Sequence, residues 1–239
     1  MTFMPKPATP LSVALTGISS MATRTLLSEL TAVYADRSGQ AVHIESVGGV
    51  DAARRVQAGE AFDLVILASE AIDKLITSGH LLADSKRDLT HCGVALAVRA
   101  GTPPPNIANE DAVRQAVLAA STLGYSTGPS GVALVKLFAH WGIAELIKAR
   151  TVTAPPGVSV GSLVASGAVA LGFQQLSELL HVEGIAIVGP LPPAIQITTT
   201  FSAAITATSE RTEDARALLD FMASPGADAA KRRQGMVPA

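Results

Sequence analysis

Short apolar runs alternate with helix-like segments along this chain of 239 residues, and that alternation limits its fold more than any other feature. Residues 62–68 (FDLVILA) form an apolar run, and residues 70–78 after it have helical spacing and end before Gly79. Parallel strands need a long crossover, usually a helix. The repeated strand–loop–helix unit therefore predicts an α/β fold with mainly parallel sheets. We expect further strands at residues 11–16, 42–47, 91–98, 121–125, 152–154, 169–173, 185–189 and 197–208.

Two proline-rich stretches indicate where the chain passes between two parts. Residues 99–109 include Pro103, Pro104 and Pro105, and more prolines follow at 190, 192 and 193. We place one crossing near Arg99 and the other near Thr198. A chain that crosses out and back predicts a discontinuous first lobe, residues 1–98 plus 199–239, and a continuous second lobe, residues 99–198.

Charge and composition exclude several functions. The 18 Lys and Arg nearly balance the 20 Asp and Glu, so no basic surface for nucleic acid is expected. No apolar run approaches the roughly 20 residues of a membrane span. Cys92 is the single cysteine, which excludes a disulfide framework, and we expect it to be buried. We expect no metal or cofactor, because the histidines lack metal-ligand spacing; they are His43, His80, His91, His140 and His181.

The residues near the two ends of the chain allow predictions about localisation and about a basic helix end. Residues 1–10 (MTFMPKPATP) lack the apolar core of a secretory signal. We therefore expect a cytoplasmic protein as the sequence stands, and a periplasmic one if a leader precedes it. Near the other end, Lys231, Arg232 and Arg233 are expected to form a solvated helix end, where cations complement the helix dipole.

Polar loops follow several predicted strands, where open α/β sheets bind ligands. In the first lobe these loops contain Ser19 and Ser20, then Gly48 and Gly49, then Ser69. A helix N-terminus beside such hydroxyl and N–H groups can hold an anion. The alternative is that the serines only cap helices and the glycines only make turns.

The second lobe has the most specific single signal, the segment 126–131 (STGPSG) before a well-patterned helix. Ser126, Thr127 and Ser130 supply its hydroxyls. Gln174 and Gln175 end a later strand, and each amide can both donate and accept hydrogen bonds. Together the loops predict a cleft that recognises a small anion through neutral donors, without a buried countercharge.

The order of these segments resembles the substrate-binding proteins of ABC transporters, which have the two-lobed type II periplasmic-binding fold, and above all their molybdate-binding branch. The similar segments cover nearly the whole chain and include LSVALTGISSMATRTLLSEL, GPSGVALVKLFAHWGI and LVASGAVALGFQQLSEL. The resemblance implies two lobes that close about a hinge, a small anionic ligand, and an ABC permease as partner if the protein is exported. It implies contacts from Ser20, Gly49, Ser69, Ser130 and the Gln174 region. We expect a monomer.

The chain departs from the molybdate branch at two places. That branch usually has a serine in a GGSG-like second loop, where this chain has Gly48, Gly49 and Val50, and its late tyrosine is absent. The Gln174–Gln175 pair suits a carboxylate or another polar organic anion better than a symmetric oxyanion. Molybdate specificity is therefore not implied.

Two further functions compete with simple binding. The segment GFQQLSEL is also similar to a subgroup to which aconitate isomerase is similar, and this implies a cofactor-free allylic proton shift on the same scaffold. Such a shift needs a base and an acid, for which Glu70, Glu178, Tyr125 and Ser20 are the nearby groups. A cytoplasmic sensor ranks last, because no DNA-binding segment is appended. We favour the binding protein and keep the isomerase as the alternative.

Overall fold

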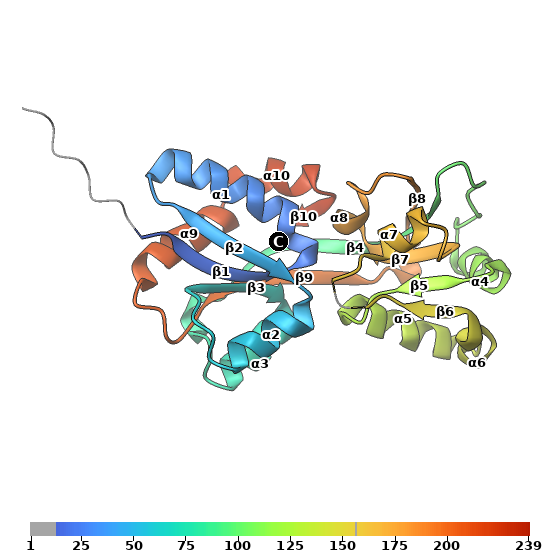
Figure 1. Ribbon diagram of the computed structural model, residues 1–239, viewed down its shortest axis with the longest axis horizontal. Helices are drawn as coiled ribbons and strands as arrows, with labels where there is room; N and C mark the ends of the chain where they lie inside the picture. The colour runs from blue at the N-terminus through green and yellow to red at the C-terminus, as the bar shows by residue number, and fades with distance from the viewer. Residues whose placement is uncertain (1–12, 156) are drawn as a thin grey trace, which may run out of the picture.

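Two groups of parallel strands are joined by two long strands in the computed structural model, which describes residues 13–155 and 157–239 (Figure 1). The strand order is β2-β1-β3-β9-β4-β7-β5-β6, with β8 and β10 also paired to β4. The predicted α/β class and two-lobed architecture are confirmed. The sheet strands are β1 (Leu15–Ser20), β2 (Val42–Val47), β3 (Leu64–Ala68), β4 (Arg87–Arg99), β5 (Leu123–Tyr125), β6 (Thr151–Thr153), β7 (Leu171–Gln175), β8 (Ile185–Pro190), β9 (Thr198–Ile205) and β10 (Met236–Pro238).

Lobe one is built on β1, β2 and β3, which are parallel to one another. Every residue of β3 is buried, as expected for a strand covered by helices on both faces. One core cluster includes Leu15 and Leu64, and a second, which includes Ile18 and Val65, lies on the other face. Its helices are α1 (Arg24–Ser38), α2 (Gly49–Gln57), α3 (Ser69–Thr77), α9 (Thr212–Ala223) and α10 (Asp228–Arg233).

Lobe two has its own core around the parallel strands β5, β6 and β7. Phe138 and Phe173 pack edge to face there with ring centroids 5.9 Å apart. No residue of this core cluster belongs to the clusters of lobe one. Its helices are α4 (Glu110–Ala119), α5 (Pro129–His140), α6 (Ala144–Ile147), α7 (Val160–Ala165) and α8 (Leu176–Leu179).

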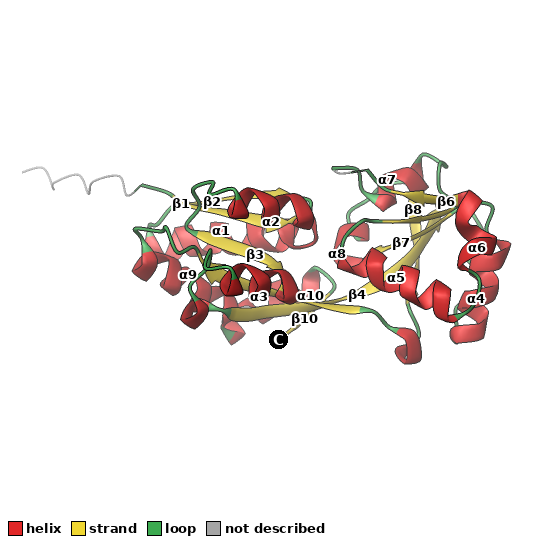
Figure 2. Cartoon of the chain, turned by 90° about the horizontal axis from the view of Figure 1, so that it is seen from below, coloured by secondary structure: helices red, strands yellow, loops and turns green. Residues whose placement is uncertain are grey.

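The strands β4 and β9 run between the lobes, as Figure 2 shows for β4. Gly93 of β4 still pairs with Thr198 of β9, whereas the next residue, Val94, pairs with Gln175 of lobe two. The crossing near Thr198 thus coincides with the start of β9, and β4 changes partners several residues before Arg99. The residue boundaries of the two lobes stay a prediction, which the separate cores support.

The carboxy-terminal segment returns to lobe one. β10 pairs antiparallel with β4, and Leu218 of α9 packs in the same core cluster as Leu15. α10 also contacts α1, and this packing buries Lys231, whose ammonium lies 3.5 Å from the Asp228 carboxylate. The expectation of a solvated basic end is therefore wrong for Lys231, although Arg232 and Arg233 are exposed.

The first strand differs from its predicted range. It begins at Leu15 and continues to Ser20, where a loop was expected, and a 3-10 turn (Met21–Thr23) then leads into α1. Residues 11 and 12 of the predicted strand lie outside the described residues, as do residues 1–10 with the expected absence of a leader. The consequence is that Ser19 and Ser20 have strand geometry, and their side chains lie on opposite faces of the sheet.

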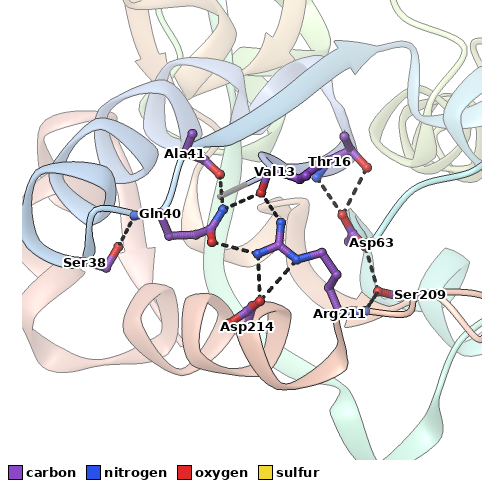
Figure 3. A network of polar contacts seen from close by, with 9 residues as sticks. All are labelled: Val13, Thr16, Ser38, Gln40, Ala41, Asp63, Ser209, Arg211 and Asp214. Atoms are coloured by element: carbon purple, nitrogen blue, oxygen red, sulfur yellow. Dashed lines mark hydrogen bonds and ion pairs between the residues drawn. The ribbon is translucent and has the colours of Figure 1, made fainter. Parts of the chain in front are cut away.

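A polar network closes the end of lobe one that is remote from lobe two (Figure 3). The Arg211 guanidinium donates to Asp214 and to Gln40 Oε1, each at 2.7 Å, and to the carbonyl oxygen of Val13. Asp63 accepts the Thr16 N–H at 2.8 Å. The network therefore fixes the entry of the chain into β1 against the start of α9.

The helices are short relative to a membrane. Within residues 13–155 and 157–239, no single helix is long and apolar enough to span one. Two neighbouring helical segments reach the length and apolar composition of a span only when they are counted together, and they are bent by 117° relative to each other. They are Pro129–His140 and Ala144–Arg150.

Candidate functional site

The strand ends of lobe one bring together three of the predicted residues. Ser20 ends β1, while Gly49 and Ser69 begin the helices that follow β2 and β3. β1 lies between β2 and β3, and parallel strands end at the same edge. A Cβ added to Gly49 would lie 3.6 Å from the Ser20 Cβ, so the second loop passes directly beside the first.

Ser20 and Ser19 differ in how their hydroxyls are used. Ser20 is only 8% exposed, and its Oγ has no hydrogen-bond partner among the described residues. It does not cap the following turn with its side chain. Ser19 is fully buried, and its Oγ lies 2.8 Å from the Ser46 Oγ in β2. The structure thus leaves the Ser20 hydroxyl free for a ligand and engages that of Ser19 within lobe one.

The predicted hydroxyl loop of lobe two lies between β5 and α5. In the described part of the chain Ser126, Thr127 and Ser130 form no side-chain hydrogen bond; Ser130 is buried and Thr127 is exposed. A Cβ at Gly131 would collide with the Ser126 carbonyl oxygen, whereas one at Gly128 would approach nothing closer than 3.7 Å. Gly131 is therefore the residue that allows this loop to fold back on the helix.

The two glutamines at the end of β7 use their amides differently. Gln174 Oε1 accepts the Gly161 N–H at 3.0 Å, and its Nε2 donates to Glu178 Oε1 at 2.9 Å. Gln175 Nε2 lies 2.7 Å from the Thr199 Oγ1 in β9, whereas its Oε1 is buried without a partner. A half-turn of this amide would present its NH₂ instead, because the Thr199 hydroxyl can donate as well as accept. Gln175 can thus accept from a ligand or donate to it.

Two contacts hold α8 against lobe one. The Ser177 Oγ donates to the Ala22 carbonyl at 2.8 Å, and the Cys92 thiol lies 3.5 Å from the same Oγ. Just after α8, His181 Nε2 lies 2.6 Å from Gln234 Oε1. Cys92 is fully buried, as predicted. These contacts bring the segment after Ser20 next to the segment after Gln175, so both residues with unpartnered side-chain atoms lie two positions from a contact between the lobes.

Glu178 is an ionisable residue beside this junction. Burial raises the pKa of its carboxyl to about 7, although the hydrogen bond from Gln174 lowers it. No ion pair involves Glu178 within residues 13–155 and 157–239. A carboxyl with a pKa near 7 can take up and release a proton at neutral pH. The sequence showed Glu178 only as a nearby group; its spacing of four residues from Gln174 was the available signal.

Two residues that hold the lobes together were missed by the sequence analysis. Ser177 and Thr199, which order the junction, were not singled out in the sequence, because only the tertiary contacts give them a role.

A surface hollow of about 500 Å³ between α1 and β2 is lined by Arg24, Ser28 and His43, among others, and contains none of the predicted ligand-binding residues. In the described ranges no cluster of three or more His, Cys, Asp or Glu is placed to hold a metal ion.

Comparison with protein families and sequences gives two matches over nearly the whole chain. Residues 15–237 match the family described as bacterial extracellular solute-binding protein. The chain is also 38% identical over 244 aligned positions to an aconitate isomerase from a Pseudomonas species, covering 97% of this chain and 92% of the relative.

Comparison with solved structures shows the same fold. The periplasmic molybdate-binding protein of Azotobacter vinelandii matches with a TM-score of 0.77 at 24% identity, over 93% of this chain and 98% of that one. The sulfate-binding protein of Mycobacterium tuberculosis also gives 0.77, at 18% identity, over 95% and 87%. A tungstate ABC transporter protein of Geobacter sulfurreducens gives 0.72 at 14% identity, over 91% and 97%.

Proposed function

Because the chain belongs to the family of bacterial extracellular solute-binding proteins, we propose that it binds a small anion at the junction of its lobes. The ligand is an organic carboxylate rather than a symmetric oxyanion. The observation that carries this proposal is that two unpartnered buried polar atoms, Ser20 Oγ and Gln175 Oε1, belong to residues two positions before Ala22 and Ser177, whose hydrogen bond joins the lobes.

Physical chemistry supports this assignment. A buried polar atom without a partner costs about 1–3 kcal/mol, so such atoms call for an explanation. A bound ligand would provide the missing hydrogen bonds. Further donors come from both lobes: the backbone beside Gly49 and the free hydroxyls of Ser69, Ser126, Thr127 and Ser130. The Ser19 hydroxyl is instead bonded to Ser46 within lobe one.

The family supports a proposal for the place of action and the partner. We infer an extracellular or periplasmic protein that delivers its ligand to an ABC permease, as the molybdate- and tungstate-binding neighbours suggest. A monomer remains our expectation. Cell fractionation of the native host with an antibody against the protein would test the location, and a signal confined to the cytoplasm would contradict it.

Ligand-induced thermal stabilisation tests the binding itself, because a ligand that binds only the folded state raises Tm. We expect a shift with cis- or trans-aconitate or with citrate, and smaller shifts with molybdate, tungstate, sulfate and phosphate. Failure of all these anions to raise Tm would exclude the proposal.

Ser20→Ala and Ser19→Ala form a matched pair for this assay. Removal of the unpartnered Ser20 hydroxyl should leave the free protein as stable as before and reduce the ligand-induced shift. Removal of the Ser19 hydroxyl breaks its bond to Ser46 and should lower Tm while the ligand-induced shift remains. The opposite pattern would show that Ser20 is not a ligand contact.

A second candidate function is isomerisation of the bound carboxylate without a cofactor. It is favoured by the full-length similarity to an aconitate isomerase and by the partly buried Glu178 beside the same junction. Interconversion of cis- and trans-aconitate by the purified protein, followed by NMR, tests it directly. Tight binding without interconversion would leave the binding protein as the function.

A further inference from the structure

The Gln174 side chain fixes both the position and the orientation of Glu178. Its Oε1 accepts the backbone N–H of Gly161, which leaves its Nε2 as the donor to Glu178 Oε1. Gln174 is buried, so the amide is held by packing as well as by these two bonds. One carboxylate oxygen of Glu178 is thereby engaged, and no hydrogen bond to the other is formed by the described residues.

Glu178 also lies directly beside the contact between the two lobes. It is partly exposed, it follows Ser177, which contacts Ala22 of lobe one, and it lies one helical turn beyond Gln175. Glu178 interacts electrostatically with the Cys92 thiol, whose own pKa is raised by burial. Within residues 13–155 and 157–239, no Lys, Arg or His forms an ion pair with this carboxylate.

We propose that Glu178 is the residue that carries the proton in an allylic shift of a bound unsaturated tricarboxylate, and that Gln174 is the positioning residue that orients it. This inference rests on the proposed function, because it assumes that the carboxylate ligand occupies the junction. Neither Ser20 nor Gln175 can replace Glu178, since a neutral hydroxyl or amide is far too weak a base.

The reaction balances with this single group. The Glu178 carboxylate takes a proton from the methylene carbon beside the double bond, and the electron pair of that C–H bond forms the new C=C. The old π pair becomes a C–H bond at the distant alkene carbon when protonated Glu178 returns the proton. No oxidant, reductant or co-reactant is consumed. Rotation about the single bond to the methylene carbon before deprotonation decides whether the new double bond is cis or trans. The raised pKa of Glu178 suits both halves of this transfer.

The test compares the wild-type protein with Glu178→Gln, using Glu183→Gln as the control because Glu183 is an exposed carboxylate of the same lobe. Conversion of trans- to cis-aconitate and uptake of solvent deuterium are followed by NMR, and binding by thermal shift. We expect Glu178→Gln to keep the aconitate-induced shift and to lose conversion by about 10²–10⁴-fold. Glu183→Gln should convert at the wild-type rate.

The outcomes separate the two proposals. Conversion by Glu178→Gln at the wild-type rate, or binding by the wild-type protein without conversion or exchange, overturns the role of Glu178 and leaves the binding function standing. Absence of any aconitate-induced shift in the wild-type protein overturns the proposed function itself.

The positioning role of Gln174 has a separate readout. The hydrogen bond from Gln174 favours the ionised form of Glu178, so Gln174→Leu should move the rising limb of the pH profile of kcat/KM to higher pH. A lower rate with an unchanged pH profile would show that Gln174 is structural only.

Discussion

The Ser177 hydroxyl in α8 donates a 2.8 Å hydrogen bond to the Ala22 carbonyl in the turn after β1, and so links lobe two to lobe one outside the two connecting strands. Ser177 is 7% exposed, so the bond is shielded from water. Opening of the lobes about β4 and β9 must either break this bond or leave α8 attached to lobe one. The contact therefore couples movement of the lobes to the place of Gln175 and Glu178.

The first prediction concerns Ser177→Ala. The variant loses a buried hydrogen bond to the Ala22 carbonyl, and we expect the free energy of unfolding to fall by about 1–3 kcal/mol. Urea denaturation measures the change. The control is Ser166→Ala, because Ser166 follows α7 directly and its exposed hydroxyl bonds, among the described residues, to the Leu163 carbonyl of that helix. This change should matter by less than about 0.5 kcal/mol. Equal effects of the two variants would refute a buried link between the lobes.

The second prediction concerns stability against pH. The pKa of Glu178 is raised from 4.5 to about 7 in the folded protein. Below pH 4.5 the carboxyl is protonated in both the folded and the unfolded protein, and its contribution to the free energy of unfolding is fully present. This contribution falls as pH rises toward 7, because the carboxyl ionises first in the unfolded protein.

Glu178→Gln removes this titration. The variant and the wild-type protein should have similar stabilities at pH 4.5, and the variant should be the more stable by up to about 3 kcal/mol at pH 8. Urea denaturation across this range, with Glu183→Gln as the control, measures the difference. A difference that does not change with pH would mean that Glu178 ionises as it does in water.

The sequence predicts the repeated strand–helix order well, because buried apolar runs and helix-ending glycines are local signals. It does not distinguish Ser19 from Ser20, since the bond to Ser46 depends on the register between β1 and β2. Burial of Lys231 accompanies the packing of α10 against α1, and desolvation of Glu178 accompanies the packing of α8 against β4, β7 and the turn after β1. Each of these features arises between elements distant in sequence, so local patterns give no sign of it.

The third prediction compares two glycines of one loop. Gly131→Ala places a methyl group against the Ser126 carbonyl, so either the loop or the start of α5 must move. We expect a loss of about 1–3 kcal/mol in unfolding free energy and at least tenfold weaker ligand binding. Gly128→Ala meets nothing closer than 3.7 Å and should change both quantities little. Calorimetric titration with aconitate provides the affinities; a harmless Gly131→Ala would mean that the loop does not touch the ligand.

The last prediction concerns the network of Figure 3. Arg211 is 24% exposed, and its guanidinium donates hydrogen bonds to Asp214, to Gln40 and to the Val13 carbonyl. Charge-assisted bonds are the stronger kind, so Arg211→Ala should lower the free energy of unfolding by about 2–3 kcal/mol. Arg211→Lys should restore only part of this, because an ammonium cannot reproduce the planar fork.

The matched control is Arg54→Ala, because Arg54 is 74% exposed and pairs only with Asp51 among the described residues. Such a surface pair contributes about 0–1 kcal/mol. Arg211 acts at the start of β1, whereas Ser20 lies at its other end, about 16 Å away at 3.3 Å per residue. Arg211→Ala should therefore lower the Tm of the free protein while the aconitate-induced shift persists. Loss of that shift in a variant that still folds would show that the two ends of lobe one are coupled.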